Sequence, residues 1–311
     1  MTKSFPVLPV SLIVVSDYVA EGNDEELRRS LWAYAADPAG VPAEIIVMAP
    51  AGFDIALPAF PESAPDQSPI FVHTHATDES SQLKDAGLAH CRHALVAVVE
   101  ADCLPEPGWL KALTDAMQDD ASIDVVSGRT IYGRDGMLLR VMSLMDRGFI
   151  EPRSRGQIIH VSNNGALYRR DILERYKYEA GCGPFVSAHL RQQAMLADGV
   201  TMAIAPAAVS VHAFGGWKFL WDVRRNKGYQ FARMMVLRQK PAQTKLGLAL
   251  HAIGFSFRSD RRTALAVWGN YCKWSDWPLF VAMMFAVRVP EFLGALAAHD
   301  PEAFKASTAY R

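Results

Sequence analysis

The sequence lacks several features that would assign it to a class of protein at once. Its four cysteines, at positions 91, 103, 182 and 272, show no CxxC spacing. That scatter argues against a zinc ribbon or a disulfide framework and suits a reducing compartment. The 311 residues carry a net charge of only −1, so no overall field attracts nucleic acid, and any anion site must be local.

Long apolar runs are also missing. The N-terminal stretch MTKSFPVLPVSLIVV is interrupted by prolines and lacks a small-residue cleavage site, so we interpret it as leading into a first strand rather than as a signal peptide. In Trp277–His299 the uninterrupted apolar part covers about ten residues, whereas a membrane-spanning helix needs ~20. Arg288, Pro290 and Glu291 follow it, which favours a buried or interfacial amphipathic helix.

What is present is an alternation of strand-like and helix-like segments in the first half of the chain. Short apolar runs predict strands buried on both faces, and the segments between them have helical spacing. This order predicts an α/β, Rossmann-type fold, with a mostly parallel sheet covered by helices on both faces. The strands are expected at Val10–Ser16, Ala43–Pro50, Ile70–Thr74 and Ala94–Glu100, and the helices at Asp24–Asp37 and Asp78–His93.

The second half is less regular. We predict strand pairs within Ile123–Gly133 and Thr201–His212, and a helix at Phe185–Gly199. Residues His160–Leu173 predict a strand, a turn and the start of a helix. From Trp217 onwards the pattern is helical, and we expect two domains, residues 1–216 and a C-terminal helical region at 217–311.

Two carboxylates follow the fourth predicted strand. Alternation along an extended chain places Glu100 and Asp102 on one face, within reach of a shared divalent cation. Their hard oxygen ligands suit Mg²⁺ or Mn²⁺. In the alternative interpretation, one carboxylate caps the next helix and the other is solvated. The prolines of the following PEPGWL stretch hold the chain in a fixed extended bend, which favours a built site.

The segment VVEADCLPEPGWLKAL resembles the Asp-x-Asp region of family 2 glycosyltransferases, which are inverting enzymes of the GT-A fold. Further segments resemble the family in the right order, and together they cover roughly residues 8 to 220. They are LPVSLIVVSDY, DESSQLKDAGLAHCRHALVAVVE, HVSNNGALYRRDILERYKY and DGVTMAIAPAAVSVHAFGG. The resemblance implies transfer of a sugar from a UDP- or GDP-type nucleotide-sugar donor to an acceptor hydroxyl.

The resemblance also implies roles for particular residues. Asp102 would be the principal ligand of Mn²⁺ or Mg²⁺, and His212 a remote third ligand. Glu100 would either contact the nucleotide or support the metal. The metal would neutralise the diphosphate leaving group as charge develops. A lone histidine at a strand end is, however, more often structural.

The resemblance also assigns residues to the acceptor and to the donor nucleotide, from their positions in the sequence. The turn Asn163-Asn164-Gly165 matches the segment that lies near the acceptor in the family. The second strand normally carries an acidic residue for the base and ribose, but here it reads Val47-Met48-Ala49. Nucleotide recognition is therefore expected from Ser16, Asp17 and Glu21, or from backbone groups.

The largest departure concerns the catalytic base. The family has a Glu-Asp pair at the start of the helix before the last strand, where this chain has Ser187 and Ala188. Neither can act as a base. His189 is the nearest group that takes a proton at neutral pH, and Glu179 is a more distant candidate. His189 on an ordinary helix surface is the alternative.

A basic and aromatic tract runs from Trp217 to Lys240. It is either a solvated helix face or a contact with the donor diphosphate through Arg224 and Arg225, or with anionic lipid. A second basic cluster, Arg258, Arg261 and Arg262, lies beside apolar helical segments and is consistent with a membrane-surface patch.

We therefore expect a metal-dependent inverting glycosyltransferase in the cytoplasm, peripheral at the inner face of the cell membrane. Its acceptor would be a glycan or a lipid-linked molecule of the cell envelope, and nucleic acid is not an expected partner. The alternative is a catalytically degenerate relative that binds or scaffolds. A nucleotidyltransferase is a weaker third hypothesis, because the loop SDYVAEGNDEE is acidic rather than basic and Gly-rich.

Overall fold

A computed structural model describes residues 8–16, 24–52, 68–152, 158, 160–181, 183–237 and 244–300. The chain divides into two compact units, each assembled from separate segments. The sheet unit comprises Met1–Ile131, Ile150–Ala180 and Leu190–Ala213, and the helical unit comprises Tyr132–Phe149, Gly181–His189 and Phe214–Arg311. The division at residue 216 that the sequence suggests stays a prediction.

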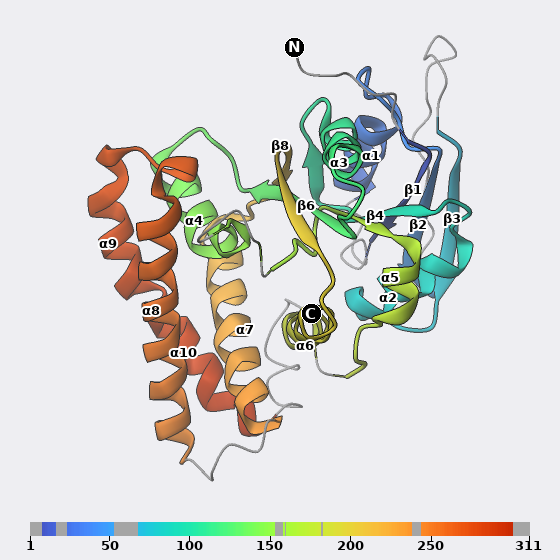
Figure 1. Ribbon diagram of the computed structural model, residues 1–311. Coiled ribbons are helices and arrows are strands. Elements are labelled where there is room, and N and C mark those ends of the chain that lie inside the picture. The colour runs from blue at the N-terminus through green and yellow to red at the C-terminus, as the bar shows by residue number, and fades with distance from the viewer. Residues whose placement is uncertain are drawn as a thin grey trace. The chain divides into compact units, whose positions relative to one another are not determined.

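The sheet unit is built on one sheet, in which eight strands are described, in the order β3-β2-β1-β4-β7-β6-β8-β5. Six of the eight run in the same direction, and only β5 and β7 are antiparallel to their neighbours. The predicted mostly parallel α/β sheet is confirmed (Figure 1). The strands are β1 Val10–Val15, β2 Glu44–Pro50, β3 Ile70–His75, β4 Leu95–Glu100, β5 Cys103–Pro105, β6 Val125–Ile131, β7 Ala166–Arg169 and β8 Met202–His212.

Helices cover both faces of this sheet, as the buried apolar runs require. On one face α1 (Asp24–Ala35) and α3 (Trp109–Asp119) pack against β1, β2 and β4 and form one apolar core. On the other face α2 (Ser80–Gly87), α5 (Arg170–Arg175) and the C-terminal part of α6 (Pro184–Ala197) form a second core. A 3₁₀ turn at Leu88–His90 ends the helix that the sequence predicts to continue to His93.

Both predicted strand pairs are wrong, because each segment forms a single strand. Val125–Ile131 is the single strand β6, and Met202–His212 is an eleven-residue strand that pairs with β6 on one side and with β5 on the other. The register between β6 and β8 shifts after Ser127. Pro206 lies in β8 opposite this shift, where a residue without an N–H does not interrupt the ladder.

The helical unit contains α4, α7, α8, α9 and α10. Thr244 caps α8 by accepting a hydrogen bond from the Gly247 N–H, and Val267 leaves the helical conformation and kinks α8 near its end. The helices are α4 Met137–Arg147, α7 Gly216–Leu237, α8 Lys245–Tyr271, α9 Trp277–Ala286 and α10 Arg288–Leu296, with 3₁₀ turns at Trp274–Asp276 and Ala297–His299. A further 3₁₀ turn, Gly148–Ile150, follows α4.

Two glycines allow α7 and α10 to cross closely. A methyl group at Gly228 of α7 would overlap the backbone of Glu291, and one at Gly294 of α10 would overlap the carbonyl of Arg225. Larger residues at either position would push the helices apart, because packed backbones cannot yield as a flexible side chain can.

Candidate functional site

The carboxyl ends of the parallel strands bring together the acidic and imidazole side chains that the sequence singles out. Val15 at the end of β1 pairs with Glu100 at the end of β4, and His212 ends β8. The turn after β4 carries Asp102, whose carbonyl accepts a hydrogen bond from the Ala213 N–H. Ligands of such sheets bind beyond these strand ends. The fold therefore places the predicted site where an α/β sheet offers one.

Asp102 and His212 lie in direct contact. The Nε2 atom of His212 is 3.2 Å from an Asp102 carboxylate oxygen, and Nδ1 is 2.8 Å from the Ala213 carbonyl oxygen. A carbonyl only accepts hydrogen bonds, so Nδ1 carries a proton and Nε2 faces the carboxylate. A lone pair on Nε2 would repel that carboxylate unless a proton or a metal cation lay between them. This geometry suits a ligand pair.

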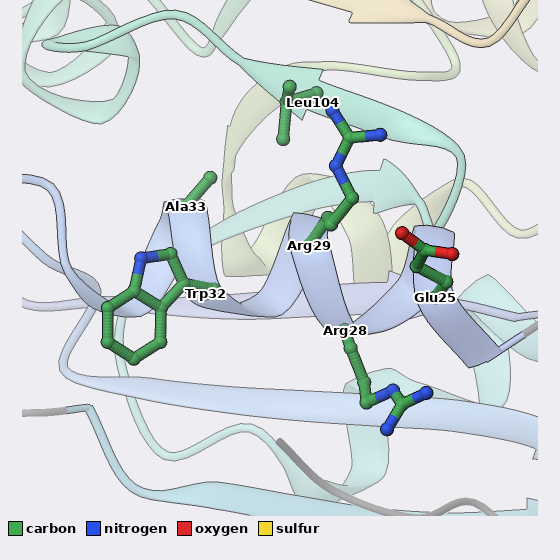
Figure 2. Close-up of a pocket in the computed structure, with 6 residues that line it drawn as sticks. All are labelled: Glu25, Arg28, Arg29, Trp32, Ala33 and Leu104. Atoms are coloured by element: carbon green, nitrogen blue, oxygen red, sulfur yellow. The ribbon is translucent and has the colours of Figure 1, made fainter. Parts of the chain in front are cut away.

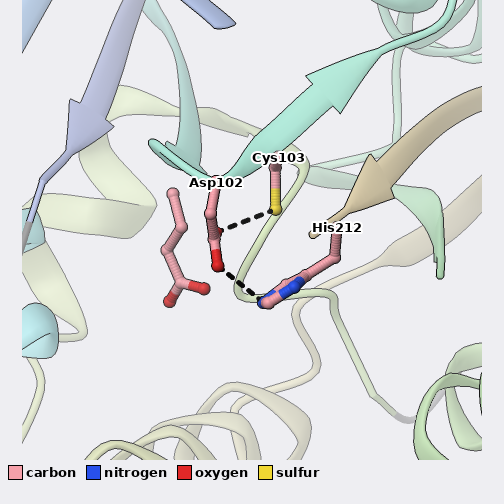
Figure 3. Close-up of side chains that lie close together, drawn as sticks. Asp102, Cys103 and His212 are labelled. Carbon is pink, nitrogen blue, oxygen red and sulfur yellow. Dashed lines mark hydrogen bonds and ion pairs between the residues drawn. The ribbon is translucent and has the colours of Figure 1, made fainter. Parts of the chain in front are cut away.

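Cys103 belongs to the same cluster, which the sequence did not indicate. It pairs directly with His212 across β5 and β8, so the two side chains project from the same face. Its thiol is buried and lies 3.7 Å from an Asp102 carboxylate oxygen (Figure 3). The Ser30 and Tyr34 hydroxyls donate to its carbonyl and fix this segment of backbone on α1. Only the antiparallel pairing of β5 with β8 reveals this neighbour.

Glu100 is held by two polar side chains of α2. The ammonium group of buried Lys84 lies 2.7 Å from its carboxylate, and the Ser80 hydroxyl donates to the same oxygen at 3.3 Å. Sequence reasoning missed both, although Ser80 and Lys84 are one helical turn apart and so share a face of α2. Nearby, burial and then the negative charge of Asp102 raise the pKa of Glu26.

The cluster fits a divalent cation. Glu100, Asp102, Cys103 and His212 each offer one ligand atom, and these atoms all lie within 4.8 Å of one another. Two carboxylates and an imidazole are a donor set for Mg²⁺, Mn²⁺ or a later transition metal, and a thiolate would favour softer ions. The chemistry of these donors supports a divalent metal site without distinguishing manganese from magnesium.

The predicted nucleotide contacts are described only in part. Ser16 is buried at the end of β1, and its hydroxyl has no hydrogen-bond partner among the described residues. A buried hydroxyl at this end of the sheet is a group that a ligand can satisfy. Asp17 and Glu21 lie outside the described residues.

The predicted acceptor-side turn is packed into the sheet unit. Asn164 is buried and its N–H donates to the Ser162 hydroxyl, while the Gly165 carbonyl accepts from the Gly128 N–H. The Asn163 side chain accepts a weak hydrogen bond from the Tyr178 hydroxyl at 3.4 Å. Their assignment to the acceptor stays a prediction.

The two candidate bases belong to different units. Glu179 is exposed in the sheet unit, whereas His189 lies half-buried on α6 in the helical unit. Ser187 and Ala188, which occupy the positions of the family's acidic pair, are both buried. Which residue takes the acceptor proton stays a prediction.

Arg224, predicted to bind the diphosphate, is fully buried in the helical unit. Its guanidinium lies 2.7 Å from Asp146, 2.9 Å from Glu291 and 3.8 Å from Asp260. Burial alone would lower the pKa of Arg224, but these three carboxylates raise it above its ordinary range. These contacts give Arg224 a role in stabilising the helical unit, and its assignment to the donor diphosphate stays a prediction.

Arg225, the neighbouring residue on α7, is half-buried and lies in the same unit. Nothing in its surroundings tests a contact with the donor, so its assignment stays a prediction.

A separate hollow of about 350 Å³ lies beside α1. Figure 2 shows Trp32 and Arg29 of α1 with Leu104 of β5 at this hollow. Leu104 alternates with Cys103 along β5, so its side chain points away from the cluster of carboxylate, thiol and imidazole. The hollow is therefore distinct from the candidate metal site.

Comparison with known proteins agrees with this geometry. Residues 65–177 match the family model described as glycosyl transferase family 2. Over this segment, about a third of the chain, the sequence is similar to family 2 glycosyltransferases. The resemblance predicted from the sequence is thus confirmed, and the matched segment contains Glu100, Asp102 and the Asn163-Asn164-Gly165 turn. A search among curated proteins finds no match.

Solved glycosyltransferases share the fold at low sequence identity. The mannosyltransferase PcManGT from Pyrobaculum calidifontis, in complex with GDP-Man and Mn²⁺, is 14% identical, with 97% of this chain and 90% of that chain covered and a TM-score of 0.60. TarS residues 1–349 from S. aureus, in complex with UDP, is 12% identical, with 98% and 93% covered and a TM-score of 0.50. These comparisons confirm the GT-A-like α/β fold of the chain.

Proposed function

We propose that the protein transfers a sugar with inversion from a nucleotide-sugar donor to an acceptor hydroxyl, and that transfer depends on a divalent metal. The observation that carries this proposal is the contact of Asp102 with His212 at the carboxyl ends of β4 and β8, inside a family 2 glycosyltransferase fold. Two of the similar solved proteins are complexes with GDP-Man and Mn²⁺ and with UDP, which supports a donor of this chemistry.

The protein's own residues would hold and orient the donor. Asp102 and His212 would ligate the metal. Glu100 and Cys103 lie close enough to add a third and a fourth donor atom. Bound there, the metal would supply positive charge to the leaving diphosphate. Lys84 would hold the Glu100 carboxylate in place through their ion pair, which is largely shielded from water. Ser16, whose hydroxyl has no hydrogen-bond partner among the described residues, would donate it to the nucleotide.

Proton transfer from the acceptor needs a base, and His189 and Glu179 are the proposed candidates. In-line displacement requires the acceptor hydroxyl opposite the departing diphosphate, with a base within hydrogen-bond reach. A neutral imidazole suits this task at neutral pH. The variants His189→Ala and Glu179→Ala separate them: the true base variant keeps donor affinity and loses turnover, whereas the other keeps both.

Titration calorimetry with a panel of UDP- and GDP-sugars, with and without Mn²⁺ or Mg²⁺, tests donor binding. We expect metal-dependent binding that Asp102→Ala and His212→Ala remove. Asp115→Ala is a matched control, because Asp115 lies on α3 and its ion pair among the described residues is with Lys111 of the same helix. No nucleotide binding by the folded protein under any condition would exclude both the transferase and a degenerate donor-binding relative.

One observation favours a second candidate function, a catalytically degenerate binding or scaffolding protein. At the positions of the family's acidic pair the chain has Ser187 and Ala188, both buried and neither able to take a proton. Release of nucleoside diphosphate decides between the candidates. Donor binding without release, over a range of glycan and lipid-linked acceptors, would identify the degenerate form.

The acceptor is proposed as a glycan or a lipid-linked molecule used in building the cell envelope, with the protein working on the cytoplasmic side of the cell membrane. The basic and apolar character of the helical unit supports this placement. Assays with acceptors in detergent and with water-soluble glycans distinguish the two acceptor classes.

A further inference from the structure

The helical unit has an unusual distribution of polarity along α9 and α10. Five large apolar residues, spaced four apart on the continuous stretch Trp277–Leu296, are between 36% and 61% exposed. They are Trp277, Val281, Phe285, Val289 and Leu293, which we call the apolar stripe. Residues four apart lie on one face of a helix, so the stripe is a continuous exposed surface.

The charged residues of the same stretch point the other way. Arg288 and Glu291 are its only charged residues, and both are buried. They form an ion pair with each other, and Arg288 also pairs with Asp260 of α8 while Glu291 pairs with Arg224 of α7. A helix that buries its charges and exposes its large apolar side chains is the reverse of a water-facing helix.

Basic and aromatic residues border the apolar stripe. Arg258, Arg261 and Arg262 are all exposed on α8, and α8 lies beside α9, because the rings of Phe257 and Phe285 are 5.6 Å apart. Trp274, 82% exposed, lies near Trp268 and Trp277 at the start of the stripe. Arginines beside apolar groups recognise an anionic lipid surface, and tryptophans favour the membrane–water boundary.

We infer that the apolar stripe docks the protein on an anionic membrane surface, with α9 and α10 lying in the interface rather than spanning the bilayer. This inference goes beyond the proposed transfer reaction and does not depend on it. A second copy of the chain fits the surface less well, because a symmetric interface would bring the arginines of both copies together.

The same residues argue against a membrane span. Among the described residues, Trp274–His299 is the one helical segment long and apolar enough to cross a membrane, with a mean hydropathy of 1.8 in its most apolar window, and half of that window is buried. A span would carry Arg288 and Glu291 into hydrocarbon and separate them from Arg224 and Asp260, which is costly. Interfacial docking leaves this ion cluster intact.

Co-sedimentation of the full chain with vesicles tests the inference, without donor or metal. Vesicles of phosphatidylcholine alone are compared with vesicles containing phosphatidylglycerol. We expect binding that is stronger to the anionic vesicles and weakened by salt. Phe285→Glu should weaken vesicle binding by at least about tenfold, because a charge replaces an apolar side chain that docking would bury in the membrane interface. Met137→Glu, which alters an exposed apolar residue on α4, is the matched control and should bind normally.

The triple variant Arg258→Gln, Arg261→Gln, Arg262→Gln separates the electrostatic from the apolar contribution to binding. It should lose most of the preference for anionic vesicles and keep its binding to neutral ones. Circular dichroism melting checks that each variant is folded. The inference is overturned if the wild-type chain binds neither kind of vesicle, or if Phe285→Glu binds anionic vesicles as tightly as the wild-type chain does. Association that resists alkaline extraction would show a span, and dimers broken by Phe285→Glu in lipid-free solution would show a second copy as the occupant.

Discussion

The sheet unit and the helical unit treat charge in opposite ways. In the sheet unit both cores are apolar, and Glu100, Asp102 and His212 collect at the strand ends. In the helical unit Arg224 and Arg288 lie inside, where they meet three carboxylates, while large apolar residues of α9 and α10 lie outside. Charges at an edge of a sheet are available to a ligand, whereas buried charges that already have partners are not.

The difference teaches that a residue's type does not fix its task. Arg224, inside α7, and Asp102, just after β4, are both charged, yet one neutralises neighbouring carboxylates and the other lies in the candidate metal site. Removing one member of a buried ion pair leaves an uncompensated charge and lowers the free energy of unfolding. Removing a metal-ligating side chain at the sheet edge lowers the affinity for the metal. Substitutions in the two units should therefore separate stability from ligand binding.

The largest effect is expected for Arg224→Met. It leaves Asp146, Asp260 and Glu291 in one buried region without their shared cation, which should cost about 3–5 kcal/mol in free energy of unfolding. Urea denaturation measures this cost, and Arg258→Met, at an exposed position on α8, is the control. A change below about 1 kcal/mol would show that the cluster contributes little and would weaken the contrast between the units.

Asp102→Ala should have the converse effect. We expect metal-dependent nucleotide affinity to fall by at least about a hundredfold. Mutation of a residue that only orients a metal ligand already lowers metal affinity by up to about a hundredfold, and Asp102 is proposed as a ligand itself. The melting temperature without metal should hardly change, because removing Asp102 relieves crowding of carboxylates at the edge. If Asp102→Ala instead destabilised the fold and still bound the metal normally when folded, Asp102 would have the stabilising role that we assign to Arg224.

A pair of glycine substitutions tests packing within the helical unit. Gly228→Ala should destabilise by about 1–3 kcal/mol, because the new methyl group overlaps the Glu291 backbone. Gly254→Ala on α8 meets no neighbour and should stabilise by about 0.5–1 kcal/mol. Thermal or urea denaturation of both variants measures the difference, and equal effects would argue against the close crossing of α7 and α10.

The smallest effect concerns acid stability at Asp276. Hydrogen bonds from the Arg140 guanidinium lower the pKa of Asp276 in the folded state. Its contribution is therefore complete above the unfolded-state pKa, near about 4, and is lost as pH falls through the lower folded value. Asp276→Asn should thus be less stable than wild type at pH 7, and the gap should narrow below about pH 4. A gap that widens on acidification would contradict this assignment.

Much of the fold follows from local patterns in the sequence. The apolar runs that become β1, β2, β3 and β4 predict a parallel sheet, because strands without a polar face must be buried on both sides. The single strands β6 and β8 were mistaken for pairs, since their pairing partners are distant in sequence. Local pattern cannot tell a long strand with two neighbours from a hairpin.

The candidate site, like the fold, has some features that follow from local sequence and others that depend on tertiary contacts. The sequence alone indicated the acidic strand end at Glu100 and Asp102 and its resemblance to family 2 glycosyltransferases, because only Ala101 separates these residues and their spacing is local. Only the tertiary structure decided that His212 lies beside Asp102 and Cys103, that Lys84 holds Glu100, and that Arg224 is buried. Each of those facts depends on contacts between residues far apart in the chain, formed when strands pair and helices pack, which no local pattern encodes.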